Sequence, residues 1–137
     1  MDSSAFVKLL IAEAGSPQVL DWVDEAMAVA CSPLGYPEMV SAFGRRLREG
    51  SLAPRLYARV LEELESQWDN VVSVAVDERL AGSLARRYPL SGADAVHLAA
   101  ALTLARSDLP VTLCSYDRRL NAAAVSEGLP VLGIIDV

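Results

Sequence analysis

The sequence predicts an α/β fold built around a short, mostly parallel central sheet, because helical segments and short apolar strands alternate along the chain. The apolar content of 53% supports this fold class, since a sheet covered by helices on both faces needs apolar strands. A partner surface would account for part of the same excess. The length of 137 residues, without repeats or low-complexity tracts, suits a single domain over residues 1–137.

The first half of the chain predicts four helices and one strand. Apolar side chains recur every three or four residues in the helical segments, as amphipathic helices require. Prolines open the second and fourth helices, a Ser-Pro-Leu-Gly turn precedes the third, and Gly50 follows it as a C-terminal cap. In chain order, the expected elements are helix 3–14, helix 17–27, strand 28–31, helix 36–48 and helix 54–68.

The second half predicts three strands and three helices. The segment 71–76 is apolar and rich in valine, which favours a buried strand. Pro89 separates two helices, and Gly128 ends the last one. The expected elements are strand 71–76, helix 77–88, helix 91–106, strand 111–116, helix 117–127 and strand 131–135.

Charge and motifs exclude several classes of protein. A net charge of −6 and a pI near 4.7 argue against a simple DNA-coating protein but not against a nuclease, whose metal-binding acids contribute negative charge. Neither GxGxxG nor GxxxxGK[ST] occurs, which disfavours nucleotide-binding enzymes. No run reaches the roughly 18 apolar residues of a membrane span. Asp2, Lys8 and Glu13 interrupt any signal-peptide core, so we expect a soluble, cytoplasmic protein without a membrane partner.

The cysteines predict no disulfide and no zinc site. Cys31 and Cys114 each lie in a short apolar run, which is typical of buried, reduced thiols. A structural zinc site needs four nitrogen or sulfur ligands, but the chain has no CxxC motif and His97 is its one histidine.

Four acidic residues stand where a parallel sheet would bring them together. Asp117 follows a predicted strand, whereas Asp2, Glu38 and Asp94 lie at or near helix starts. In a parallel α/β fold these positions meet at the carboxyl edge of the sheet, where ligands bind. Position alone leaves a simpler interpretation open, because acids are also favoured at helix N-termini as caps.

Electrostatics indicates what such a cluster would bind. Two carboxylates about 5 Å apart repel by roughly 3 kcal/mol at an effective dielectric constant of about 20. A cluster of four would therefore take up protons or a cation. Carboxylate oxygens without imidazole or thiolate ligands select Mg²⁺ or Mn²⁺.

The acids belong to four segments in a recognisable order: residues 2–8 (DSSAFVK), 36–43 (YPEMVSAF), 92–99 (GADAVHLA) and 115–120 (SYDRRL). These segments resemble the four motifs of PIN-domain ribonucleases of the VapC type, the toxins of type II toxin–antitoxin systems. The third segment is the most specific of the set. The resemblance covers nearly the whole chain and implies a three-layer α/β/α sandwich around the short parallel sheet.

The resemblance also implies an activity, the Mg²⁺- or Mn²⁺-dependent endonucleolytic cleavage of RNA. Asp2 and Asp94 would be the principal metal ligands, and Asp117 would complete the metal site. Glu38 would hold a second ion or orient the attacking water. Family members tend to form homodimers and to bind a smaller antitoxin protein, so we expect both partners here.

Other polar residues receive supporting roles. The resemblance makes Ser4 and Ser115 candidates for hydroxyl groups that support the metal ligands. Arg118 and Arg119 follow Asp117 directly and are candidates for RNA contact, because arginine forks suit phosphates.

Several conspicuous side chains are expected to be structural. We interpret His97, three positions after Asp94, as a partly buried structural histidine. The spacing of Trp22, Trp68 and Tyr57 on helices favours packing over base stacking.

One departure from the family pattern keeps a second function open. Family members usually carry several apolar residues before the first aspartate, whereas only Met1 precedes Asp2 here. A shortened first strand would favour a catalytically silent PIN-fold binding or scaffold module. A phosphoacceptor signalling domain also gathers acids at strand ends, but it needs a lysine near the site. The one lysine, Lys8, lies beside the first motif rather than after a late strand, which argues against this class.

Overall fold

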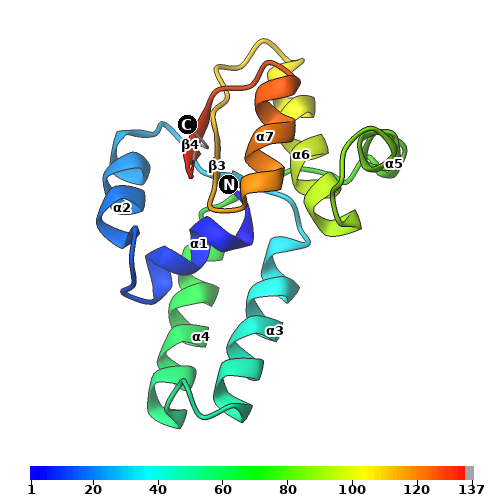
Figure 1. Ribbon diagram of the computed structural model, residues 1–137. Helices are drawn as coiled ribbons and strands as arrows, with labels where there is room; N and C mark the ends of the chain where they lie inside the picture. Colours follow the sequence, from blue (N-terminus) through cyan, green and yellow to red (C-terminus); the bar gives the residue numbers. More distant parts are fainter. Residues whose placement is uncertain (135–137) are drawn as a thin grey trace.

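The computed structural model describes residues 1–134 and has the predicted α/β architecture (Figure 1). The elements are α1 (Ser3–Leu10), α2 (Ser16–Glu25), β1 (Ala30–Cys31), α3 (Gly35–Arg48), α4 (Pro54–Trp68), β2 (Val72–Ser73), α5 (Glu78–Arg87), α6 (Gly92–Ala105), β3 (Leu113–Ser115), α7 (Arg118–Ser126) and β4 (Val131–Gly133). Every predicted helix and strand is present in the predicted order, and residue 135 of the last expected strand lies outside the described residues.

The strands are parallel, as predicted, but they form two pairs. β1 pairs with β2 through Ala30 and Val72, and β3 pairs with β4 through Leu113 and Val131. The first residues of the chain lie between the pairs: the Met1 amino group donates to the Ala30 carbonyl at 2.9 Å, and the Asp2 amide donates to the Cys114 carbonyl at 3.1 Å. Two residues thus connect the edges of both pairs without forming a ladder of their own.

The boundaries of several elements differ from the expectation. The strand expected over 71–76 is reduced to Val72–Ser73, because β2 finds a ladder partner only in the two-residue β1. The expected burial of this strand is wrong as well, since both residues of β2 are exposed and only the following Val74 is buried. The first helix, expected to reach residue 14, ends at Leu10. There the Ser16 hydroxyl donates to the Ile11 carbonyl at 3.1 Å, and Gly15 has a φ of 92°, which turns the chain into α2.

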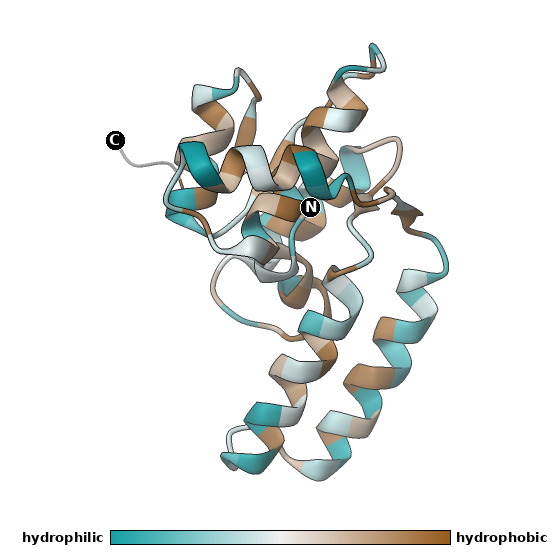
Figure 2. Ribbon diagram, turned by 90° about the vertical axis from the view of Figure 1, so that its right-hand side faces the viewer, coloured by the Kyte–Doolittle hydropathy of each residue, from teal (hydrophilic) through white to brown (hydrophobic). Residues whose placement is uncertain are grey.

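Two hydrophobic clusters hold the elements together. One surrounds α6 and includes Leu98, Leu113 and Leu120. The other joins α1, α3 and α4 through Phe6, Phe43 and other buried side chains. Hydrophilic and hydrophobic residues are interspersed along α3 and α4, as expected for helices with one buried face (Figure 2).

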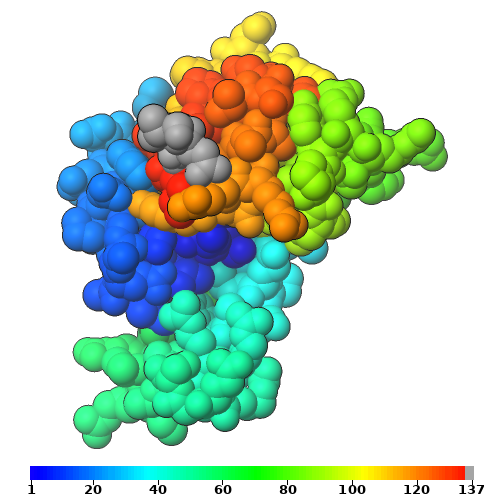
Figure 3. Space-filling model, viewed as in Figure 1, coloured from blue at the N-terminus to red at the C-terminus, as the bar shows by residue number. Residues whose placement is uncertain are grey.

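The helices α3 and α4 form an arm that extends from the rest of the molecule (Figures 1 and 3). In Figure 3, α1, drawn in dark blue, lies between this arm and the C-terminal third of the chain. Trp68 closes the base of the arm, with its ring 5.7 Å from Phe6 and 5.6 Å from Tyr36. Its predicted packing role is thereby confirmed, and Tyr57 packs against the same cluster.

Within residues 1–134, no helix combines the length and apolar character needed to cross a bilayer.

Both cysteines are free and buried, as predicted. Burial raises the pKa of Cys114 to about 11 and also raises that of Cys31. A thiol with such a pKa is ionised in only about one molecule in a thousand at pH 8. We therefore expect both thiols to resist a thiolate-specific reagent at pH 8 until the protein is unfolded, as measured by absorbance with and without denaturant. Rapid labelling of the folded protein would contradict this burial.

Candidate active site

Asp2 occupies a buried position at the start of α1 and is 4% exposed. Its Oδ1 accepts a hydrogen bond from the Ala5 amide at 3.1 Å, so it caps the helix. Its carboxylate also accepts hydrogen bonds from the hydroxyls of Ser4, at 2.8 Å, and Ser115, at 2.6 Å. These donors fix the orientation of a carboxylate that water scarcely reaches.

Ser115 connects the first and last of the predicted acids. Its side chain is fully buried at the end of β3, where the hydroxyl donates to Asp2 Oδ2 and accepts from the Asp117 amide at 3.0 Å. Its carbonyl accepts from the Asn121 side chain at 2.9 Å. Ser4 makes a parallel contact, because its hydroxyl accepts from the Tyr116 amide at 2.9 Å. The two serines thus join the start of α1 to the segment between β3 and α7.

Asp94 and Asp117 line one cavity of about 400 Å³. Asp117 caps α7 by accepting from the Leu120 amide at 2.8 Å. Asp94 lies in the first turn of α6, where Ser91 is the cap and its hydroxyl donates to Asp94 Oδ2 at 2.9 Å. Burial raises the pKa of Asp94, against the opposing effect of the Ser91 hydrogen bond, and the charges of Asp117 and Asp2 raise it further. The charges of Asp2 and Asp117 therefore both act on Asp94, although Asp2 does not itself line the cavity.

Glu38 lies to one side of the three aspartates. It stands in the first turn of α3 and lines a neighbouring cavity of about 340 Å³ together with Ser3 and Ser4. Its Oε1 accepts from the Ser3 hydroxyl at 3.4 Å and contacts His97 Nε2 at 2.5 Å. Tyr116 lines both cavities, which therefore adjoin each other, and its ring packs toward Lys8 and Trp22.

His97 is buried, as predicted, but sequence analysis did not identify its contact with Glu38. The available signal was its position three residues after Asp94, at a spacing that places both residues on neighbouring parts of one helix. That signal does not identify α3 as the partner helix, because the two contacting residues are 59 positions apart.

The donor set suits a hard divalent cation, although the acids are not gathered into a closed ligand shell. Among residues 1–134, no three His, Cys, Asp or Glu side chains lie close enough together to form a ready-made ion site. The acidic groups that line the cavity are the carboxylates of Asp94 and Asp117, whose oxygens favour Mg²⁺ or Mn²⁺. Burial, followed by the charges of Asp117 and Asp2, raises the pKa of Asp94, and a bound cation would act in the opposite direction.

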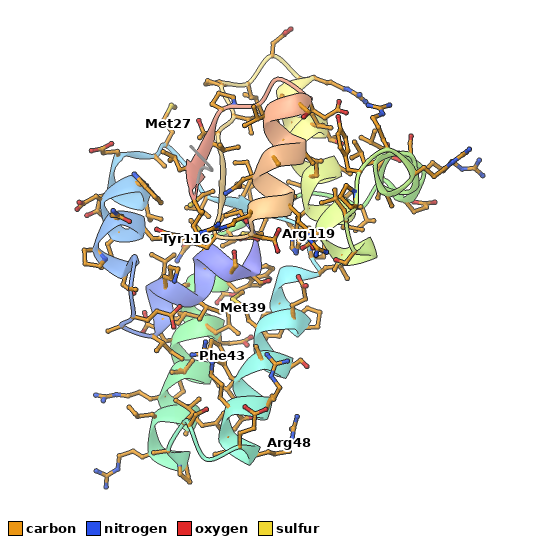
Figure 4. The ribbon with its side chains drawn as sticks, viewed as in Figure 1. Met27, Met39, Phe43, Arg48, Tyr116 and Arg119 are labelled. Atoms are coloured by element: carbon orange, nitrogen blue, oxygen red, sulfur yellow. The ribbon has the colours of Figure 1, made fainter. Side chains whose placement is uncertain are left out.

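The two predicted arginines lie at the rim of the same cavity. Arg118 and Arg119 are exposed residues in the first turn of α7 and line the cavity with Asp94 and Asp117. Figure 4 shows Arg119 at the foot of α7, with Tyr116 toward α1 and α2. Trp22 packs against the same tyrosine, with ring centroids 6.4 Å apart, which supports the predicted packing role. The cavity thus combines acids on its walls with cationic side chains at its edge.

The fold and these carboxylates define the class of the protein as a PIN-like α/β domain with an acidic cavity. No family model matches the chain. Two relatives from strains of Mycobacterium tuberculosis, Ribonuclease VapC45 and Ribonuclease VapC49, are each 39% identical over 133 residues, which cover 95% of this chain and 91% of the relative. The chain therefore belongs to the VapC family of PIN-domain proteins.

Substitution of Ser115 tests its connecting role. In Ser115→Ala, the buried Asp2 carboxylate loses its shortest hydrogen bond and the Asp117 amide loses its acceptor. We expect the free energy of unfolding to fall by about 1–3 kcal/mol in urea titrations. Ser126→Ala, which removes an exposed hydroxyl at the far end of α7, is the control and should change little. Equal effects of the two substitutions would contradict the role.

Neutralisation of Asp94 should stabilise the fold at neutral pH. The raised pKa means that the folded chain holds the Asp94 proton more tightly than the unfolded chain, so wild-type stability decreases as pH rises through this range. Asp94→Asn has no such proton. Its Tm should exceed that of the wild type at neutral pH, and the difference should shrink in acid, where Asp94 is protonated in both states. Calorimetry across pH measures this, and a lower Tm of the variant at neutral pH would contradict it.

Proposed function

We propose that the protein is a divalent-metal-dependent endoribonuclease that hydrolyses RNA phosphodiester bonds and is the toxin of a toxin–antitoxin pair. The observation that carries the proposal is that Asp94 and Asp117 line one cavity and that Ser115 joins the buried Asp2 to Asp117. The names of the two relatives support RNA as the substrate.

In this proposal the cofactor is Mg²⁺ or Mn²⁺. Asp2 and Asp94 would hold it, Asp117 would complete the site, and Glu38 would hold a second ion or orient the attacking water. When bound, the cation supplies Lewis acidity toward the phosphoryl group and activates water.

The remaining steps use the chain's own residues. The buried hydroxyls of Ser4 and Ser115 hold Asp2 in one orientation, so this carboxylate needs little rearrangement during the reaction. Arg118 and Arg119 at the rim would bind phosphate groups of the RNA and bring the scissile bond to the cavity. A water oxygen then forms a bond to phosphorus while the P–O bond in line with it breaks; the water loses a proton to solvent, and the leaving oxygen takes one up from solvent.

The proposed partners and location follow from family membership. We propose a homodimer, a smaller antitoxin protein that keeps the toxin inactive, and action in the cytoplasm. Exposed apolar side chains, including Leu20, Met27 and Leu56, would provide part of the contact surface.

The substitution Asp117→Asn separates catalysis from helix capping. Asparagine is also a good N-cap, so stability should be retained, whereas the loss of charge should reduce RNA cleavage by about 100-fold or more. The matched control is Asp77→Asn, because Asp77 caps α5 in the same way, through the Leu80 amide, but lines neither cavity. Cleavage of a structured RNA is measured with Mg²⁺, with Mn²⁺ and with EDTA.

Three results would contradict the proposal: cleavage in EDTA, full activity of Asp117→Asn, or an equal loss in Asp77→Asn. A wild-type protein that binds RNA or a protein partner but never cleaves RNA would instead support the silent scaffold module.

A further inference from the structure

His97 is a polar residue in the most apolar part of the molecule. It lies on α6, whose other buried residues are alanines and leucines, and it is 4% exposed. Its Nε2 reaches Glu38 Oε1, but its Nδ1 is buried without a hydrogen-bond partner among the described residues. A buried nitrogen without a partner destabilises the fold relative to an apolar side chain of similar size. Stability therefore does not explain this histidine.

His97 contacts the first turn of α3. Gly35 begins α3, and a Cβ added there would lie 3.3 Å from the Trp68 ring and 3.9 Å from His97 Cε1. The imidazole thus lies at ordinary contact distance from the first turn of α3, where the Trp68 ring is the closer neighbour. Glu38 projects from that same turn, so the imidazole and the carboxylate meet across the α3–α6 contact.

The hydrogen bonds to Glu38 leave one of its oxygens available. Among the described residues, both hydrogen bonds that Glu38 receives, from His97 and from Ser3, end on Oε1. An ionised carboxylate can only accept, so Nε2 carries the proton of the His97 contact. The carboxylate side chain is 32% exposed and lines the second cavity, whereas the imidazole side chain is 2% exposed. A rigid donor therefore holds one oxygen of a carboxylate that faces solvent.

We propose that His97 is a positioning residue that fixes the orientation of Glu38 at the edge of the active site. The proposal rests on the proposed function, in which Glu38 orients water or holds a second ion. Through its hydrogen bond to Oε1, His97 restricts the rotation of a long, partly exposed side chain and so keeps Oε2 directed for the reaction. It does not itself touch the RNA or the cation.

The variants His97→Leu and His97→Gln distinguish positioning from packing. Leucine fills the apolar site without a donor, so we expect an unchanged or higher Tm with a kcat about tenfold lower and a KM within about twofold of the wild type. Glutamine can place an amide N–H near the former Nε2 and should restore most of kcat. Leu102→Ala, a core truncation on the same helix, should lower Tm and leave the kcat of the folded protein unchanged.

A second measurement does not depend on activity. His97 is the one histidine of the chain, so the imidazole ¹⁵N signals of an untagged protein need no assignment. In the wild type they should show a proton on Nε2, and Glu38→Gln should shift the Nε2 signal because the charged acceptor is gone. The Asp77→Asn control should leave it unchanged.

The outcomes separate this inference from the proposed function. Wild-type kcat in His97→Leu, no recovery in His97→Gln, or an imidazole spectrum unaffected by Glu38→Gln overturns the inference while metal-dependent cleavage by the wild type still stands. A wild-type protein that never cleaves RNA overturns the proposed function, and the positioning role falls with it.

Discussion

A buried serine hydroxyl holds the two ends of the candidate site together. Ser115 Oγ donates to Asp2 at 2.6 Å and accepts from the Asp117 amide at 3.0 Å, so one group joins the start of α1 to the start of α7. Since β3 ends at Ser115, the same contact ties both helices to a strand. The first two residues lie between the strand pairs, and the hydroxyl fixes the carboxylate of the second of them. The geometry of the site thus depends on side-chain hydrogen bonds as well as on a ladder.

Two aspartates of the candidate site are also the N-terminal caps of helices. Asp2 and Asp117 each accept a main-chain hydrogen bond with Oδ1 at the start of a helix, where the dipole favours a negative charge. Asp94 is placed differently, because Ser91 caps α6 and Asp94 itself stands within the first turn. Burial and, to a smaller extent, the two neighbouring charges raise its pKa. The interpretation of these acids as caps and their interpretation as ligands are therefore compatible, and position alone could not separate them.

The helices were predictable because a period of 3.6 residues is a local property of the sequence. The position of the acids was predictable in part, because a residue that follows a strand or opens a helix lies at a known edge of a parallel sheet. Strand lengths were less predictable: the valine-rich segment 71–76 has strand propensity throughout, but its ladder ends where β1 ends. The contact of His97 with Glu38 was not predictable, since it depends on how two helices from distant parts of the chain pack together.

The charged residues at the cavity determine how it would interact with an RNA phosphate before and after a cation binds. Charges beyond about 8 Å are strongly screened at physiological salt, so the net charge of −6 matters less to an approaching phosphate than the residues at the cavity. There, Asp94 and Asp117 (−2) stand against Arg118 and Arg119 (+2), and the buried Asp2, which Ser115 joins to Asp117, brings the local charge to −1. An RNA phosphate would be repelled by the walls and attracted by the rim. A divalent cation on the aspartates changes the sum to +1, so in the proposed reaction cation binding turns the same cavity from repelling phosphate to attracting it.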